Sequence, residues 1–154
     1  MGAWGVRALQ SDAGLDCKQI FDEYALSNPS AQMGKIIELY KKEGLLPQNE
    51  QEIDYLYDHA VLVLAELLLQ FCAEKKLVIT YYNKQQNKDE ERTLRIWQYG
   101  EKELDYLAHR IEDIVMPAEE EHEIYELWED NDSFLEWKSY INALLDGLEE
   151  IPRN

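Results

Sequence analysis

The longest apolar stretch of the chain covers residues 53–72, where the sequence reads IDYLYDHAVLVLAELLLQFC. A helix that is apolar almost all round must be covered by other elements on most of its sides. About 20 helical residues span ~30 Å, which is close both to the diameter of a small domain and to the thickness of a membrane core. Asp54 and Asp58 open the stretch, and His59 and Glu66 interrupt it. We therefore predict a buried central helix and not a membrane span.

Apolar residues at helical spacing predict further helices at about residues 12–27, 29–42, 101–115, 118–129 and 133–150. Their starts carry side chains that can accept hydrogen bonds from unpaired first-turn amides. These are Ser11, Asn28 ahead of Pro29, Asn49 with Glu52 for the central helix, and Ser133 with Glu136. The predicted fold is mainly α: a single domain, residues 1–154, with about six helices bundled around the central one.

Residues 77–98 break the helical spacing. The runs LVITYY and RTLRIWQ are rich in β-branched and aromatic residues, and the polar segment NKQQNKDEE separates them. This pattern predicts a small β-hairpin. Its aromatic residues, Tyr81, Tyr82, Trp97 and Tyr99, either pack the hairpin onto the helices or form an exposed patch for a partner.

The amino terminus carries a recognisable pattern. It reads GAWG, followed by A-L-x-S-D-x-G-L-D from Ala8 to Asp16. This pattern resembles the start of a bacterial family known as domain of unknown function 4259 (DUF4259). The E-L-W of residues 126–128 and the F-x-x-W of residues 134–137 are similar to a Trp-rich pair of carboxy-terminal helices in that family. The resemblance implies no activity, cofactor or catalytic residue. We expect Trp4 to anchor this segment against the bundle.

The chain is strongly acidic, with a formal net charge of −17. Residues 1–76 carry 12 acids and 7 bases, whereas residues 77–154 carry 20 acids and 8 bases. Such a surface repels nucleic acid and anionic membranes, so a basic protein is the expected partner. Cys17 and Cys72 do not form a disulfide framework or a metal-site spacing. Since the first ten residues also lack a secretory signal, we expect a cytoplasmic protein with reduced thiols.

The most acidic segment is also the predicted partner-binding site. Eight acids fall between residues 119 and 132 with no lysine or arginine among them. Within this segment we predict that Glu119, Glu120, Glu123, Tyr125 and Trp128 contact the partner, the acids by steering and the aromatic rings as anchors. Ile124, Leu127 and Trp128 could equally form the inner face of the helix.

His59 and Glu66 form a polar seam on the otherwise apolar central helix. They lie seven residues apart, ~10 Å along the helix axis, which is too far for a shared metal ion. The seam marks either the line where the helix meets water or the site of a small hydrolase or metal-dependent enzyme. If other elements cover it, Glu66 needs a cationic partner, because an unpaired buried carboxylate is very costly.

Two further ladders combine histidine with carboxylates at helical spacing. Asp105, His109 and Asp113 form one ladder, and Glu119, His122 and Glu126 form the other. Either ladder could bind a divalent ion, but the apolar positions of both helices lie on the opposite side. We therefore expect solvated faces, and we predict no metal site.

The sequence contains no G-x-S-x-G, no phosphate-binding glycine loop and no H-E-x-x-H motif, so we predict no catalytic residues and no cofactor. The leading hypothesis is a non-enzymatic, acidic protein-binding module. An immunity protein that neutralises a basic bacterial toxin is one form of this class. The alternatives are an enzyme that uses His59 and Glu66, and a homo-oligomer built through exposed aromatic residues; the sequence leaves the oligomeric state open.

Overall fold

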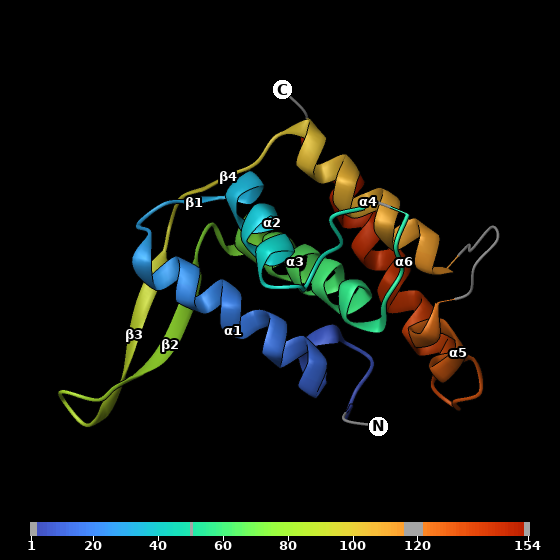
Figure 1. The fold of residues 1–154 in the computed structure, drawn as a ribbon, viewed down its shortest axis with the longest axis horizontal. Helices are drawn as coiled ribbons and strands as arrows, with labels where there is room; N and C mark the ends of the chain where they lie inside the picture. The colour runs from blue at the N-terminus through green and yellow to red at the C-terminus, as the bar shows by residue number, and fades with distance from the viewer. Residues whose placement is uncertain (1–2, 50, 116–121, 153–154) are drawn as a thin grey trace.

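The computed structural model describes residues 3–49, 51–115 and 122–152, and it is mainly α-helical, as the sequence predicts. The helices are α1 (Asp12–Ser27), α2 (Met33–Lys42), α3 (Tyr55–Glu74), α4 (Glu101–Val115), α5 (Glu123–Glu129) and α6 (Phe134–Glu150), with a short 3-10 helix, η1 (Ala8–Gln10), ahead of α1 (Figure 1). Four strands complete the fold: β1 (Ala31–Gln32), β2 (Leu77–Asn83), β3 (Lys88–Leu94) and β4 (Trp97–Gln98).

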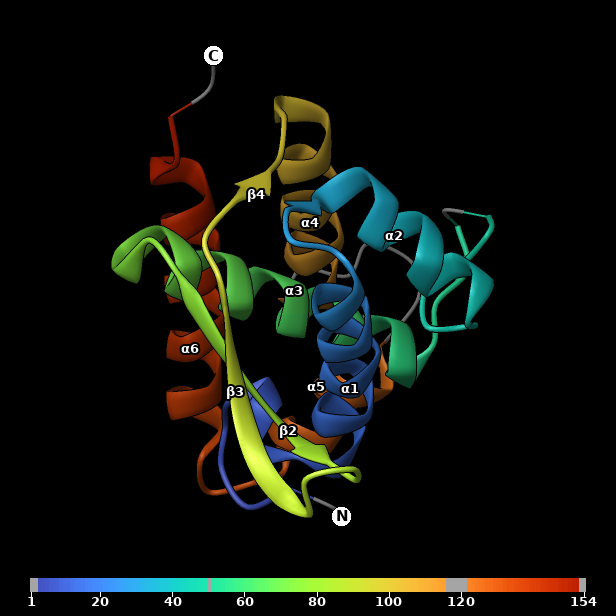
Figure 2. The ribbon, with the colours of Figure 1, turned by 90° about the vertical axis from the view of Figure 1, so that its left-hand side faces the viewer.

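Helix α3 is the central helix that the sequence predicts. All of its residues from 58 to 68 are buried, and α1, α4 and α6 pack around it. Figure 2 shows α3 between α6 and α1. By length and composition α3 could cross a membrane, but most of it is buried inside the protein, as in a core helix.

The start of α3 differs from the prediction. Asp54 caps the helix, because its side chain accepts a hydrogen bond from the amide of Leu56 at 2.8 Å. Asn49 instead accepts from the amide of Gln51 within the preceding turn. The helix therefore begins at Tyr55, two residues after the predicted start, and it ends at Glu74, where Lys75 takes a left-handed conformation with φ 62°.

The predicted start of the second helix at Pro29 is wrong. Asn28 ends α1, because its side-chain amide donates to the carbonyl of Tyr24. The chain then forms β1, which pairs in parallel with β4. Since the partner strand lies 66 residues along the chain, at Trp97 and Gln98, the local sequence carries no signal for this pairing, and α2 begins only at Met33.

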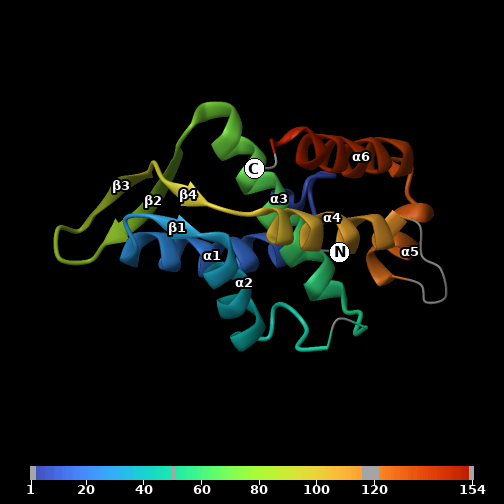
Figure 3. The same ribbon diagram turned by 90° about the horizontal axis from the view of Figure 1, so that it is seen from above.

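The predicted hairpin is confirmed over residues 77–94, where β2 and β3 pair antiparallel. The hairpin and α5 lie at opposite ends of the molecule (Figure 3). Of the aromatic residues predicted either to pack the hairpin onto the helices or to form an exposed patch, one is buried and another is exposed. Trp97 is buried, with ring centroids 5.1 Å from Phe21 and 5.8 Å from Phe71, whereas Tyr82 is 54% exposed.

The amino-terminal segment folds against α1 by its backbone. Ser11 caps α1 as predicted, accepting from the amide of Gly14 at 3.0 Å. A side chain at Gly14 would place its Cβ 1.8 Å from the carbonyl oxygen of Ala8, so only glycine fits here. The predicted anchoring role of Trp4 is wrong, because its side chain is 62% exposed and only its backbone amide is fixed, by the carbonyl of Gln10.

Candidate functional site

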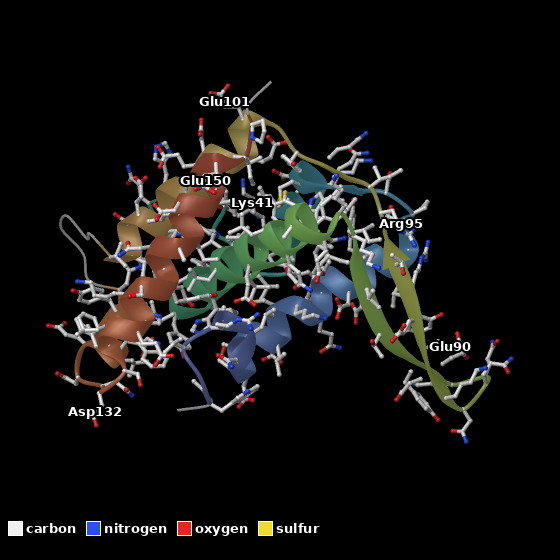
Figure 4. All side chains as sticks on the ribbon, turned by 180° about the vertical axis from the view of Figure 1, so that it is seen from behind. Lys41, Glu90, Arg95, Glu101, Asp132 and Glu150 are labelled. Carbon is white, nitrogen blue, oxygen red and sulfur yellow. The ribbon has the colours of Figure 1, made fainter. Side chains whose placement is uncertain are left out.

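The segment of α5, α6 and the turn between them carries many exposed acids. Residues 122–152 contain nine acids and a single lysine or arginine, Lys138. All nine acids are exposed, and we call them the acidic surface: Glu123, Glu126, Glu129, Asp130, Asp132, Glu136, Asp146, Glu149 and Glu150. Figure 4 shows Asp132 in the turn between the two helices and Glu150 at the far end of α6.

Two leucines lie exposed among these acids. Leu127 on α5 is 40% exposed, and Leu135 on the first turn of α6 is 78% exposed, more than any other large apolar residue that the structure describes. Acids and exposed apolar groups thus occur together on this surface. Such a combination suits a protein partner better than a small anion.

The structure places Trp128 in the core and packs Tyr125 against it. Trp128 is 9% exposed and stacks on Trp137, with ring centroids 6.2 Å apart. Tyr125 is half-buried, with its ring edge against Phe134 and Trp137. Trp128 therefore belongs to the inner face of α5, which was the alternative interpretation, and Leu127 is on the outer face instead of the inner one.

The predicted steering acids are only partly within the described residues. Glu123 begins α5 and is exposed. Glu119 and Glu120, with the first part of the predicted acidic helix, lie outside the described residues. Glu123 and the acids that follow it therefore define the site from here on.

The polar seam of α3 does not face water. Glu66 is 7% exposed, and it has the cationic partner that a covered carboxylate requires. The guanidinium of Arg7 donates to one oxygen of Glu66 at 2.7 Å, and the hydroxyl of Tyr140 donates to the other at 2.8 Å. Tyr140 in turn accepts from the amide of Ala8. Glu66 thus ties the amino-terminal segment and α6 to α3.

His59, the other member of the seam, is 4% exposed. One ring nitrogen, Nδ1, lies 3.0 Å from the carbonyl oxygen of Tyr55, and the ring packs against that of Tyr55 at 4.3 Å between centroids. Burial lowers the pKa of His59. The ring is therefore neutral at neutral pH and serves as a core residue.

His122 forms a buried network that the sequence did not predict. It lies between two carboxylates, with Nδ1 2.6 Å from Asp58 and Nε2 2.8 Å from Asp113. His122 and Asp58 are each 1% exposed, so the expectation of a solvated histidine on this ladder is wrong. Asp113 remains half-exposed. The network joins α3 and α4 to the start of α5.

Burial alone would lower the pKa of His122, but the hydrogen bonds and charges of Asp58 and Asp113 outweigh burial and raise it. Burial also raises the pKa of Asp58, although His122 partly offsets that rise. The arrangement favours the protonated form of the imidazole, which lies between two carboxyl groups. Because both ring nitrogens are engaged and the ring is buried, His122 is not free to exchange a proton with a substrate.

Within residues 3–49, 51–115 and 122–152, no group of three histidine, cysteine or acidic side chains is arranged to hold a metal ion. Both cysteines are free thiols: Cys17 is buried, and Cys72 is partly exposed. The polar atoms of Glu66 and His122 are used in structural contacts. The role that these contacts support for Glu66 and His122 is therefore to link helices to one another.

The family model described as Domain of unknown function (DUF4259) matches residues 2–140. The chain belongs to this family. No curated protein and no protein of solved structure matches the chain.

The DUF4259 match confirms the resemblance seen in the sequence. It spans the segment from the amino terminus to the first part of α6, so it includes both buried networks and the α5 part of the acidic surface. The family description names no activity. The function must therefore be argued from the surface and contacts of this chain.

Proposed function

We propose that this protein is a non-enzymatic protein-binding module whose acidic surface takes a basic protein as its partner. The observation that supports this most is the concentration of nine exposed acids around one lysine on α5, α6 and their turn. Like charges at this density repel one another and lower stability. A basic partner would relieve that repulsion on binding.

The charge favours fast association. A surface with one sign of charge raises the rate at which an oppositely charged partner arrives by about 10- to 1,000-fold at low salt. The same charge disfavours nucleic acid and anionic membranes as partners. Steering of this kind raises the association rate. The dissociation rate depends mainly on the close contacts in the complex.

Leu127 and Leu135 supply apolar contact area within the charged surface. Interfaces usually combine a small apolar centre with a polar rim, and the acids around these two leucines provide such a rim. The core beneath this surface, where Trp128 stacks on Trp137, keeps α5 and α6 in fixed positions. We therefore assign steering to the acids and close contact to the leucines.

A toxin-neutralising immunity protein is the form of this function that we favour. Many bacterial toxins are nucleases with basic substrate clefts, and a small acidic protein can occupy such a cleft. The net charge of −17 would also suit a protein that binds a basic enzyme in the cytoplasm. This step is an analogy of charge and size, so it is part of the proposal and rests on the acidic surface alone.

The enzyme alternative receives less support from the contacts of its two residues. Glu66 is paired with Arg7 and Tyr140, and His59 is buried against Tyr55. A substrate would have to displace these contacts to reach either side chain.

The test of the proposal neutralises the acidic surface and measures both binding rates. The variant carries Glu123→Gln, Glu129→Gln and Asp132→Asn, and its matched control carries Asp16→Asn, Glu23→Gln and Glu43→Gln. All six acids are exposed, and both variants change the net charge by the same amount. The partner is first isolated on immobilised wild-type protein, and stopped-flow association with the purified partner is then recorded.

We expect the surface variant to associate several-fold more slowly, with little change in its dissociation rate. The control should stay close to the wild type, because its acids lie on α1 and at the end of α2. Equal slowing in both variants would mean that net charge alone matters and would reject this surface as the binding site.

One specific observation supports the homo-oligomer alternative. Val78, Tyr82 and Ile96, on the hairpin and the link that follows it, are 46%, 54% and 54% exposed. Light scattering coupled to size-exclusion chromatography distinguishes the two functions. A mass that rises with concentration, and that Tyr82→Ser returns to the monomer value, would favour the oligomer.

A further inference from the structure

A cavity of about 560 Å³ lies where α3 and α6 end, far along the chain from the acids of α5. Its apolar wall includes Leu69 and Phe71 from α3 and Ile151 and Pro152 from the chain after α6. We call it the C-terminal cavity. Pockets of ~300–1,000 Å³ with mostly apolar walls are the usual size for small-molecule ligands.

Two backbone features lie at the wall of the cavity. A side chain at Gly147 would place its Cβ 2.7 Å from the side chain of Leu69, so glycine lets α6 approach α3 closely at this wall. At Lys75 the chain then turns sharply out of α3 in a left-handed conformation, φ 62°. That conformation costs a residue other than glycine about 1 kcal/mol or more.

Two cations line the cavity in this otherwise acidic protein: Lys75 after α3 and Arg95 after β3. The register of the hairpin brings them to the same end, because Leu77 pairs with Leu94. Both side chains are exposed. Neither forms an ion pair with a carboxylate of the described residues, even though acids outnumber bases by 32 to 15 in the chain.

The wall also carries a polar pair. The Tyr99 hydroxyl lies 3.5 Å from the Cys72 thiol sulfur. The hydrogen bond to Cys72 and burial raise the pKa of Tyr99 to about 12, so the hydroxyl keeps its proton at neutral pH. Tyr99 and Pro152 also line an adjoining cavity of about 380 Å³. A protonated hydroxyl between two cavities is available to donate a hydrogen bond to a ligand.

We propose that the C-terminal cavity binds an amphipathic monoanion, a carboxylate with an aliphatic or aromatic body. The carboxylate lies at Lys75 and Arg95, and the apolar body lies along Leu69, Phe71 and Ile151. The cavity borders the acidic surface at Glu150, which lines its wall, but its proposed ligand does not depend on the partner proposed above.

The remaining charged residue of the wall narrows the ligand class. Glu150 ends α6 and also lines the cavity, and Figure 4 labels it apart from Arg95. Its carboxylate repels a second anionic group. A dianion such as a phosphate monoester is therefore disfavoured, and a ligand with one charged end and one apolar end fits.

Fluorescence titration of the full chain with cis-parinaric acid tests the proposal, and dodecanoate displaces the probe below its critical micelle concentration. Dodecan-1-ol, which has the same tail without the charge, is the comparison ligand. The variants are Lys75→Gln and Arg95→Gln, and the matched controls are Lys84→Gln and Lys88→Gln near the tip of the hairpin. Ala73→Trp fills the cavity from its exposed wall without changing the charge.

We expect saturable binding of dodecanoate, at least tenfold tighter than that of dodecan-1-ol. Lys75→Gln and Arg95→Gln should each weaken it about tenfold, the controls should leave it unchanged, and Ala73→Trp should abolish it. Thermal unfolding of each variant shows whether it is folded. Absence of saturable binding, equal affinity for the alcohol, or binding that survives Ala73→Trp in a folded variant would each overturn the proposal.

Discussion

Replacing His122 by leucine should strongly destabilise the fold. The substitution leaves Asp58, which is 1% exposed, without the imidazole that lies 2.6 Å away. Removing one partner of a buried ion pair costs ~3–5 kcal/mol, out of a total stability of roughly 5–15 kcal/mol. Asp113 is half-exposed, so its lost contact adds little. We expect His122→Leu to lower the free energy of unfolding by ~3–5 kcal/mol at pH 6.

The double variant Asp58→Leu/His122→Leu separates charge from packing. A buried ion pair replaced by apolar residues of similar volume often costs little. The double variant should therefore be more stable than His122→Leu by ~2 kcal/mol or more. Urea unfolding followed by circular dichroism measures these two variants and the single variant Asp58→Leu. A cost below ~1 kcal/mol for His122→Leu, or simple addition of the two single effects, would refute the buried pair.

The same network predicts a dependence of stability on pH. The folded-state pKa of His122 is raised, so its contribution is complete below about pH 6.5 and is lost as the pH rises through the raised value. Of the neighbouring groups, His59 has a pKa lowered by burial and Asp58 has a pKa raised by burial, and the charge of Arg110 also acts on Asp58. As the pH rises above about 6.5 the wild type should lose stability, whereas the double variant should not lose this contribution.

Three further substitutions test other parts of the fold by urea unfolding. Leu64→Ala, at a fully buried position of α3, should cost ~2–5 kcal/mol, and an unchanged midpoint would contradict the central position of this helix. Tyr140→Phe removes a hydrogen bond to buried Glu66 and should cost ~1–3 kcal/mol; a neutral effect would show that Arg7 alone satisfies Glu66. Trp4→Ala should change stability by less than ~0.5 kcal/mol, because the indole is 62% exposed, and a large loss would place it in the core.

Local patterns predicted those parts of the fold that depend on local interactions. The spacing of apolar residues placed α4 and α6 almost to the residue, and Ser11 was correctly predicted to cap α1. The need of Glu66 for a cation followed from the cost of burying a charge, although the sequence could not identify Arg7, 59 residues away. The cost of burying a charge thus predicted that Glu66 contacts a cation, and only the structure identified that cation as Arg7.

The errors concern contacts between distant segments. The pairing of β1 with β4 moved the start of α2, and the approach of Asp58 to His122 across 64 residues buried a histidine that its own helix would leave solvated. Helical periodicity describes only one helix, so it cannot show that a neighbouring element covers its polar side. The same limit explains Trp128, whose burial depends on stacking against Trp137 on α6.

The salt dependence of the association rate tests the proposed steering by the acidic surface most directly. Between about 0.1 M and 1 M NaCl the screening length falls from ~10 Å to ~3 Å. Stopped-flow association of the wild-type protein with its purified partner should slow at least tenfold over this range, while the dissociation rate changes little. An association rate that stays constant across this range would contradict the claim that the acids of α5 and α6 steer a basic protein to this surface.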